Sequence, residues 1–420
     1  MSKNAFYAQS GGVSAVINAS ACGVLETARR YPNSIAKVLA GRDGIIGALT
    51  EDLIDTSLES EDAIAALKHA PGAAFGSCRY KLGAVTEHRA LYERLVEVFK
   101  AHDIGYFFYN GGGDSQDTTY KVSLVSTELS NPIVCVGVPK TVDNDLPITD
   151  CSPGFGSMAK YLATSVREAA FDLMAMSRTS TKVFVLEVMG RHAGWATAAC
   201  ALAAEDESDA PHVLLFPEIA FDEERFLAKV KSALERYDHC VIAVSEGVKG
   251  SNGAFLSAGS EDAFGHAQLG GVAPLIARLI STKLHCRCHW AVPDYLQRSG
   301  RHIASETDVE QAYTVGWAAV EFAINGRSAI MPAIRRISDI PYRWDIVEAP
   351  LAAIANKEKL LPRDFISDDG FGITEAARRY LAPLIVGESY PPYRHGLPAY
   401  VRLQNVAVPR KLAETFDIQS

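Results

Sequence analysis

The chain has 420 residues, a length that predicts two or three domains sharing extensive interfaces. With 48% hydrophobic and 22% charged residues, its composition is that of a globular protein and excludes disordered, collagenous and coiled-coil classes. The formal net charge of -9 argues against nucleic acid or an anionic membrane as the main partner, so we expect neither.

The N-terminal residues, MSKNAFYAQSGG, lack the basic segment and long apolar stretch of a secretion signal. No window of the sequence approaches the roughly 18 consecutive apolar residues of a membrane span. The eight cysteines are scattered, without the spacings of a zinc site or a disulfide framework, which predicts buried free thiols. We therefore expect a cytoplasmic protein.

Short apolar runs bounded by Gly or Asn predict strands along the first 246 residues. These runs are 4–9, 35–40, 104–109, 133–138, 182–188, 212–216 and 240–246. Between them, helical periodicity predicts helices starting near Ser14, Glu87 and Met158. Near-continuous apolar strands alternating with helices are typical of a parallel sheet covered on both faces, so the predicted fold class is α/β.

Two places in the sequence predict domain boundaries. The stretch DCSPGFGS at 150–157 interrupts the strand and helix pattern, directly before the long predicted helix. After about residue 330 the chain becomes richer in Pro and Arg, and its last part predicts a wrapping extension.

Glycine-rich turns follow two of the predicted strands, at the edge where ligands bind in open parallel sheets. After the first strand come Gly11 and Gly12, which let backbone N–H groups approach an anion, although a tight turn alone also needs glycine. Residues 110–115, NGGGDS, open a predicted helix, and three successive glycines predict close approach of a ligand. Asp114 or Ser115 is alternatively an N-cap of that helix.

The stretch PKTVDND at 139–145 is the most informative in the sequence. It directly follows a buried type of strand and combines Lys140 and Thr141 with Asp143 and Asp145. These residues offer a base, a cation and a partner for metal or phosphate. A solvated loop is the alternative, but the position at a strand end favours chemistry.

Other turns of the same kind also carry a cation or an acid. They are the turn of Met189, Gly190 and Arg191, the turn that begins with Glu246, residues Tyr295 to Arg298, and the glycine loop that holds Arg79 with Lys81 beside it. Arginine binds phosphate oxygens in a fork geometry. Together these turns predict a substrate rich in phosphate.

The ordered motifs GG, GGGDS, PKTVDND, MGR, EG and YLQR resemble those of the phosphofructokinase family over residues 4–330. The resemblance implies two doubly wound Rossmann-like domains with a C-terminal extension. Residues 1–155 with about 297–345 would bind pyrophosphate, 156–296 would bind fructose 6-phosphate, and 346–420 would be the extension.

Two residues resemble the pyrophosphate-dependent branch of that family. Asp114 stands where ATP-using members carry a glycine, and its carboxylate would block and repel the nucleotide's α-phosphate. Lys140 precedes the TVDND loop, where its ammonium would compensate charge on the transferring phosphate. The implied reaction is reversible, glycolytic phosphoryl transfer from pyrophosphate to the 1-hydroxyl of fructose 6-phosphate.

The resemblance also implies residue roles. The catalytic set would be Asp143 as general base with Lys140, Asp114 and Arg191. Pyrophosphate would be bound by Gly11, Gly12, Arg79, Gly112, Gly113 and Ser115. The sugar phosphate would be bound by Thr141, Val142, Asp143, Lys182, Met189, Gly190, Arg191, Glu246, Tyr295, Leu296, Gln297 and Arg298.

The implied cofactor is Mg²⁺, but the sequence departs from the family pattern near it. Gly113 stands where members usually carry Asp or Asn, so we expect pyrophosphate oxygens to hold the metal, with Asp114, Asp143 or Asp145 helping through water. Lys182 matches a cation that reaches a neighbouring subunit's site, which implies a homodimer or homotetramer. His289 stands where a second such cation is expected, with Arg287 as a substitute.

Two alternatives remain open. One is an ATP-dependent phosphofructokinase that tolerates Asp114. The other is a noncatalytic, sugar-phosphate-binding regulatory subunit, although such a subunit is expected to lose its base and this chain retains Asp143.

Overall fold

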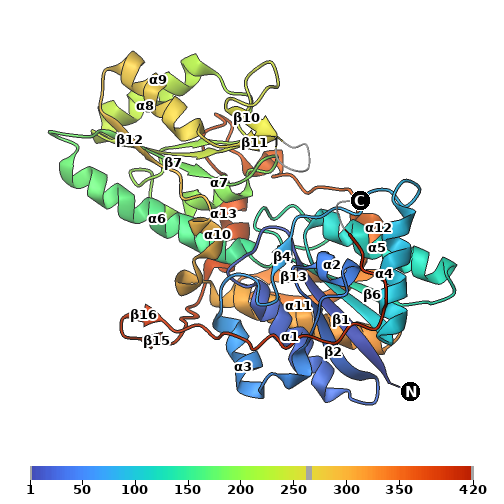
Figure 1. The fold of residues 1–420 in the computed structure, drawn as a ribbon. Coiled ribbons are helices and arrows are strands. Elements are labelled where there is room, and N and C mark those ends of the chain that lie inside the picture. Colours follow the sequence, from blue (N-terminus) through green and yellow to red (C-terminus); the bar gives the residue numbers. More distant parts are fainter. Residues whose placement is uncertain (1, 262–266, 418–420) are drawn as a thin grey trace. The chain divides into compact units, whose positions relative to one another are not determined.

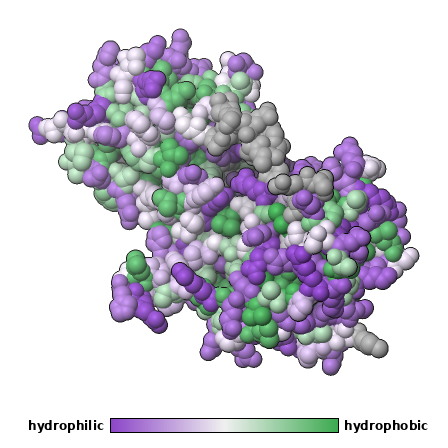
Figure 2. All heavy atoms as spheres, viewed as in Figure 1, coloured by the Kyte–Doolittle hydropathy of each residue, from purple (hydrophilic) through white to green (hydrophobic). Residues whose placement is uncertain are grey.

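The computed structural model describes residues 2–261 and 267–417 and divides the chain into two compact units (Figure 1). Unit 1 comprises Met1–Gly154, Arg301–Glu358 and Gly387–Ser420, and unit 2 comprises Phe155–Gly300 and Lys359–Val386. Hydrophilic residues cover much of the face shown in Figure 2, with hydrophobic ones scattered between them, as is normal for a globular protein.

Unit 1 is built on an eight-stranded sheet in the order β14-β13-β6-β5-β1-β2-β3, with β4 beside β1. The central pairs are parallel, while β3 and β14 pair antiparallel at the two edges. The strands are β1 (Lys3–Ser10), β2 (Ile35–Gly41), β3 (Leu53–Asp55), β4 (Ser77–Cys78), β5 (Ile104–Gly111), β6 (Val134–Pro139), β13 (Ile330–Asp339) and β14 (Tyr342–Pro350).

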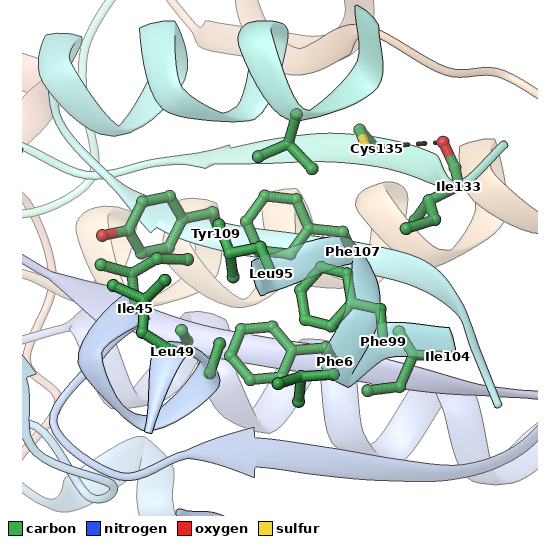
Figure 3. Close-up of a cluster of buried hydrophobic side chains, with 14 of the residues drawn as sticks. Phe6, Ile45, Leu49, Leu95, Phe99, Ile104, Phe107, Tyr109, Ile133 and Cys135 are labelled. Carbon is green, nitrogen blue, oxygen red and sulfur yellow. Dashed lines mark hydrogen bonds between the residues drawn. The ribbon is translucent and has the colours of Figure 1, made fainter. Parts of the chain in front are cut away.

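Helices cover both faces of this sheet. The helices of unit 1 are α1 (Ile17–Arg30), α2 (Ile45–Leu49), α3 (Glu61–Ala66), α4 (Arg89–Ala101), α5 (Gly113–Glu128), α11 (Glu306–Ile324) and α12 (Leu351–Ile354). The core under α2, α4 and α5 contains stacked aromatic rings (Figure 3): Phe6 and Phe107 have centroids 5.7 Å apart, and Phe99 lies 5.1 Å from Phe6. This packed core holds the strand ends that carry the motifs.

Unit 2 is built on a four-stranded parallel sheet in the order β12-β7-β9-β8. Its strands are β7 (Val183–Val188), β8 (Val213–Leu215), β9 (Cys240–Ser245) and β12 (Cys288–Ala291), with a separate hairpin of β10 (Ala258–Glu261) and β11 (Ala267–Leu269). The helices are α6 (Phe155–Met176), α7 (Trp195–Cys200), α8 (Glu223–Tyr237), α9 (Val272–Leu284), α10 (Leu296–Ser299) and α13 (Glu375–Leu381).

The predicted strands and helices are confirmed. Every predicted strand begins and ends within two residues of an observed strand. The three named helices begin within three residues of Ser14, Glu87 and Met158. The α/β fold class is therefore confirmed. The eight cysteines are free thiols, of which Cys78, Cys286 and Cys288 are half-buried and the others buried. Within residues 2–261 and 267–417, no helix has both the length and the apolar character needed to span a bilayer.

Residues 346–420 are shared between the units. The chain completes β14, passes through unit 2 as 359–386 and returns to unit 1 at Gly387. There it runs beside β3, where the Val408 N–H donates to the Leu53 carbonyl at 2.8 Å.

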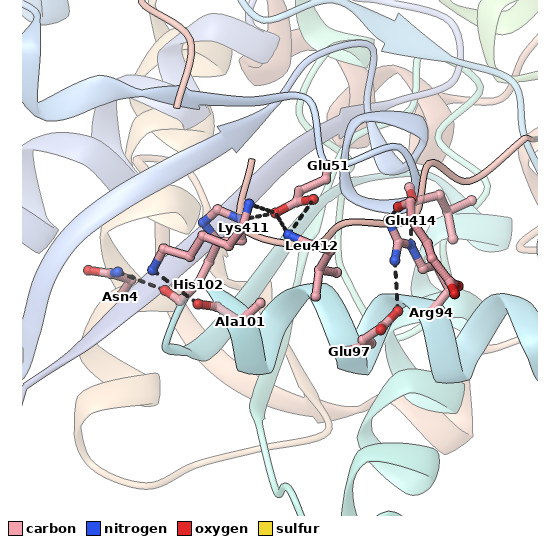
Figure 4. A network of polar contacts seen from close by, with 10 residues as sticks. Asn4, Glu51, Arg94, Glu97, Ala101, His102, Lys411, Leu412 and Glu414 are labelled. Carbon is pink, nitrogen blue, oxygen red and sulfur yellow. Dashed lines mark hydrogen bonds and ion pairs between the residues drawn. The ribbon is translucent and has the colours of Figure 1, made fainter. Parts of the chain in front are cut away.

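A buried carboxylate holds the end of this segment (Figure 4). Glu51 is 2% exposed and accepts hydrogen bonds from the backbone N–H groups of Lys411, at 2.6 Å, and Leu412, at 3.3 Å. The ring of His102 lies 2.6 Å from the same carboxylate. Burial opposes ionisation, but these donors outweigh it, so the pKa of Glu51 lies below its ordinary value.

Candidate active site

In unit 1, four strand ends bring the predicted donor residues to one edge of the sheet. Ser10 of β1 pairs with Cys78 of β4, and Gly111 of β5 pairs with Pro139 of β6. Because β1 also pairs with β5 in parallel, the residues that follow these strands are neighbours. They are Gly11, Gly12, Arg79, Gly112, Gly113 and Lys140.

Lys140 is a buried cation beneath the first glycine turn. Lys140 is only 4% exposed, and its Nζ donates a hydrogen bond to the Gly12 carbonyl at 2.6 Å. Its backbone N–H donates to the Gly111 carbonyl at 3.2 Å. A buried ammonium needs such partners, because desolvation without them is costly. The two turns therefore hold one fixed positive charge between them.

Gly11 is required by its backbone conformation, and it lies beside this ammonium. Its φ of +72 lies in the left-handed region, and a Cβ there would stand 3.5 Å from Lys140 Nζ. Its N–H donates to the Cys78 carbonyl at 2.9 Å, which joins the turn to β4 just before Arg79. Arg79 is exposed at this turn.

Asp114 lies in the first turn of α5 and forms an ion pair with Lys81. Asp114 Oδ1 is 2.7 Å from Lys81 Nζ, and the two side chains are 58% and 45% exposed. The N-cap alternative for Asp114 and Ser115 is wrong: Gly112 is the N-cap, without a side-chain hydrogen bond. Ser115 instead donates to Ser10 Oγ at 2.8 Å and ties α5 to β1. Lys81 was predicted only as a neighbour of Arg79.

The acidic loop after β6 is held in place by its own buried residues. Thr141 Oγ1 accepts the N–H of Asp143 at 3.1 Å. Asn144, fully buried with a φ of +53, accepts the Ser152 N–H at 2.9 Å. Thr141 and Val142 are buried, which leaves Asp143 and Asp145 half-buried in a fixed loop. Only the polar composition of the motif hinted at a structural role for Asn144.

A buried carboxylate from α11 supports this loop from below. Asp308, 2% exposed, accepts the N–H of Gly154 at 2.9 Å. Gly154 in turn forms a parallel bridge with Thr141. Asp308 is more than 150 residues from the motif, so no local pattern predicts this contact. Among the described residues, no group of three or more His, Cys, Asp or Glu side chains is arranged to hold a metal ion.

In unit 2, the ends of β7 and β9 bring four of the predicted substrate residues together. The Met189 N–H donates to Gln297 Oε1 at 3.1 Å, and the Gly190 N–H donates to Glu246 Oε1 at 3.3 Å. Next to them, a Cβ on Gly247 would stand 1.9 Å from the Arg191 carbonyl oxygen. The EG motif therefore needs glycine for close approach to the MGR turn.

The carboxyl group of Glu246 has a raised pKa. Burial is the main cause; the N–H of Gly190 opposes it, and the nearby Glu187 carboxylate adds to it. Glu187 is 3% exposed and accepts the backbone N–H groups of Gly271 and Ala273, at 3.0 and 2.8 Å, at the start of α9. Glu187 is not among the predicted site residues, because a single acid inside an apolar strand gives no local signal of a site.

The YLQR residues comprise one buried side chain, two exposed ones and the half-buried Arg298. Gln297 is 3% exposed and reaches Met189, whereas Tyr295 and Leu296 are each 63% exposed. The Arg298 guanidinium carbon lies 4.1 Å from the centre of the Tyr295 ring, a cation–π contact.

Lys182 is not with the other predicted substrate residues of unit 2. It precedes β7, whose six residues separate it by about 20 Å from Met189 at the opposite end. There it forms an ion pair with Asp238, and its N–H donates to the Arg287 carbonyl at 3.0 Å. Arg287 and the exposed His289 therefore lie at the same edge as Lys182.

A model of the phosphofructokinase family matches residues 4–323 of the chain. The chain belongs to the phosphofructokinase family. A phosphofructokinase relative, the pyrophosphate–fructose 6-phosphate 1-phosphotransferase of Methylococcus capsulatus, is 65% identical, covering 99% of each chain. The enzyme of that name from Halomonas elongata is 62% identical, covering 98% of each.

Solved phosphofructokinase structures agree with the sequence relatives. The pyrophosphate-dependent phosphofructokinase of Nitrosospira multiformis superposes with a TM-score of 0.92 at 60% identity, covering 99% of this chain and 100% of that one. The family resemblance predicted from the motifs is therefore confirmed.

Proposed function

We propose that the chain transfers a phosphoryl group from pyrophosphate to the 1-hydroxyl of D-fructose 6-phosphate, giving fructose 1,6-bisphosphate and phosphate in a reversible glycolytic step. The relatives of 60–65% identity that share this length carry names for this activity. The choice of pyrophosphate over ATP rests on the position of Asp114 in the turn after β5. There Asp114 Oδ1 lies 2.7 Å from Lys81 Nζ and forms an ion pair with it. A nucleotide longer than pyrophosphate would meet this carboxylate.

Unit 1 is the proposed pyrophosphate-binding domain. Gly11, Gly12, Gly112 and Gly113 would present backbone N–H groups, with Ser115 and Arg79 completing the donor site. The 16-residue helix α5 begins at this turn, and the positive N-terminal end of its dipole favours an anion there. The ammonium of Lys140, buried beside the turn, supplies charge that needs no reorganisation when the phosphoryl group moves.

Asp143 is the proposed general base, taking the proton from the sugar's 1-hydroxyl, with Thr141 and Val142 shaping its loop. Unit 2 is the proposed sugar-phosphate-binding domain. There Met189, Gly190, Arg191 and Glu246 would contact the sugar phosphate, and Tyr295, Leu296, Gln297 and Arg298 would bind its 6-phosphate end. Arg191 would also stabilise developing charge.

We propose that Mg²⁺ binds together with pyrophosphate and is held mainly by pyrophosphate oxygens rather than by a set of protein ligands. Metal binding through the substrate fits the described residues, which contain no group of three or more His, Cys, Asp or Glu side chains placed to hold a metal ion. Asp114 and Asp145 are the carboxylates that would contribute, through water, because Mg²⁺ commonly keeps several waters. When bound, the metal would neutralise charge on the phosphate oxygens.

Self-association as a homodimer or homotetramer is part of the proposal, because Lys182 lies far from the residues it should assist within one chain. Exposed apolar side chains of unit 2, Phe171 at 67% and Trp290 at 50%, support such an assembly. The cytoplasmic location stays a prediction from the sequence.

Donor choice tests the proposed function. With fructose 6-phosphate saturating, kcat/KM for pyrophosphate should exceed that for ATP by at least about 100-fold, or about 2.7 kcal/mol. Asp114→Gly should shift this ratio toward ATP by at least about tenfold. The control is Asp62→Gly, an exposed carboxylate in the first turn of α3, which should leave the ratio unchanged. Equal use of ATP by the natural chain would refute the proposal.

Glu246 predicts a pH dependence on the sugar side. Its pKa is raised, so the carboxylate becomes protonated, and becomes a weaker acceptor for a sugar hydroxyl, at a higher pH than an ordinary glutamate. As pH falls through that value, KM for fructose 6-phosphate should rise in the natural chain. In the Glu246→Gln variant, KM for fructose 6-phosphate should be high and should not change over this pH range. The control is Glu224→Gln, an exposed position on α8, which should behave as the natural chain.

A further inference from the structure

Residues 390–400 form a projecting arm on unit 1. Its hairpin, β15 (Tyr393–Arg394) and β16 (Leu397–Pro398), stands off from the rest of that unit at the lower left of Figure 1. His395 and Gly396 make the turn, with φ of 52 and 83. The proposed activity gives this arm no task.

The base of the arm is anchored by a buried arginine. Arg301 is fully buried, and its Nη2 donates hydrogen bonds to Ser389 Oγ at 3.0 Å and to the Lys68 carbonyl at 2.7 Å. Close by, the N–H of Glu306 donates to the Gly387 carbonyl at 3.2 Å. The arm is therefore held at a defined position on unit 1 rather than attached as a loose terminus.

The arm itself exposes large apolar side chains. Leu397 is 72% exposed, Tyr390 61%, Tyr393 55% and Tyr400 37%. Figure 2 shows hydrophobic and hydrophilic residues side by side on this projection. A two-stranded hairpin alone is marginally stable in water, and a gathering of exposed aromatic and aliphatic side chains marks an interaction surface. Such an arm gains stability when a partner covers Tyr393 and Leu397.

The charge of the segment indicates the partner. Between Glu388 and Glu414 there is no Asp or Glu, while the arm carries Arg394 and His395. The whole chain has a formal net charge of -9, whereas Arg394 is the only formally charged side chain of residues 390–400, so a second copy carries a net charge opposite to that of the arm. A second copy of the same chain is also present at equal concentration.

We propose that the arm docks onto a second copy of this chain, burying Tyr393 and Leu397 and placing Arg394 against acidic side chains. In a two-fold assembly each copy would give one arm and receive one, which doubles the contact. This surface belongs to unit 1 and is separate from the edge of β7 that carries Lys182 in unit 2. The inference does not depend on which phosphoryl donor is used.

Sedimentation velocity over a range of protein concentrations tests the arm. The natural chain should self-associate, and Leu397→Asp should weaken association at least tenfold because a carboxylate replaces a buried leucine. Leu58→Asp is the matched control, at 55% exposure on unit 1 outside the arm, and should associate as the natural chain. A natural chain that stays monomeric, or a Leu397→Asp variant that associates as tightly as Leu58→Asp, would overturn the proposal.

Hydrogen exchange and salt give a second test that needs no folding-sensitive variant. Amides of residues 390–400 in the natural chain should exchange more slowly at concentrations where it is assembled than where it is dissociated. Arg394→Glu should weaken association, and the difference from the natural chain should shrink as salt is raised. Equal exchange of the arm at both concentrations means that it is not covered by a second copy.

Discussion

Asp143→Ser is expected to lower kcat for fructose 6-phosphate phosphorylation by about 1,000-fold, the size of a lost general base. The loop that carries Asp143 is held by Thr141 Oγ1 and by buried Asn144, so the substitution should remove the carboxylate without moving the backbone. The Kd for fructose 6-phosphate, measured by calorimetry, should stay within about threefold of the natural value. The loss then lies in the chemical step rather than in binding.

Two further variants make this result specific to the base. Asp143→Asn keeps the shape and polarity of the side chain but accepts no proton, so it should be as inactive as Asp143→Ser. Asp62→Ser, an exposed carboxylate of α3, should retain full turnover. If Asp143→Asn turned over within tenfold of the natural chain, another group would have to deprotonate the sugar, and the proposed mechanism would be wrong.

The strand ends were predictable because periodicity and glycine position are local. Apolar runs such as 104–109 and 133–138 have the length and β-branched content of buried strands, and a parallel sheet places the following turns at one edge. The grouping of Gly11 with Lys140 follows from that topology. The Gly12 carbonyl contact at 2.6 Å confirms their nearness in unit 1.

Contacts between distant segments were not predictable. Lys81 and Asp114 are paired, and Asp308 supports the TVDND loop, but each pair is joined only by folding, and a single sequence records no such coupling. Glu187 was not predicted because a single acid in an apolar strand is also found on ordinary edge strands. In the structure its carboxylate accepts the Gly271 N–H at the start of α9. The course of 387–417 over unit 1 depends on Glu51, whose partners lie about 360 residues away in the chain.

Lys140→Met is expected to lower kcat with pyrophosphate by about 100- to 1,000-fold, or about 2.7 to 4 kcal/mol. Methionine keeps most of the side-chain length but removes the ammonium that lies beside Gly11 and donates to the Gly12 carbonyl. Because this charge is already fixed before the reaction, its effect should fall on the transition state, lowering kcat and kcat/KM alike.

Lys81→Met is the matched comparison for Lys140→Met. Lys81 is half-exposed and its ion pair with Asp114 lies in solvent, so its loss should cost only about 1 kcal/mol in kcat/KM for pyrophosphate. Unfolding in urea should separate catalytic loss from any damage caused by an unpartnered Gly12 carbonyl. If Lys140→Met raised KM and left kcat unchanged, the ammonium would bind pyrophosphate in the ground state, and the charge that stabilises transfer would have to come from elsewhere in the site.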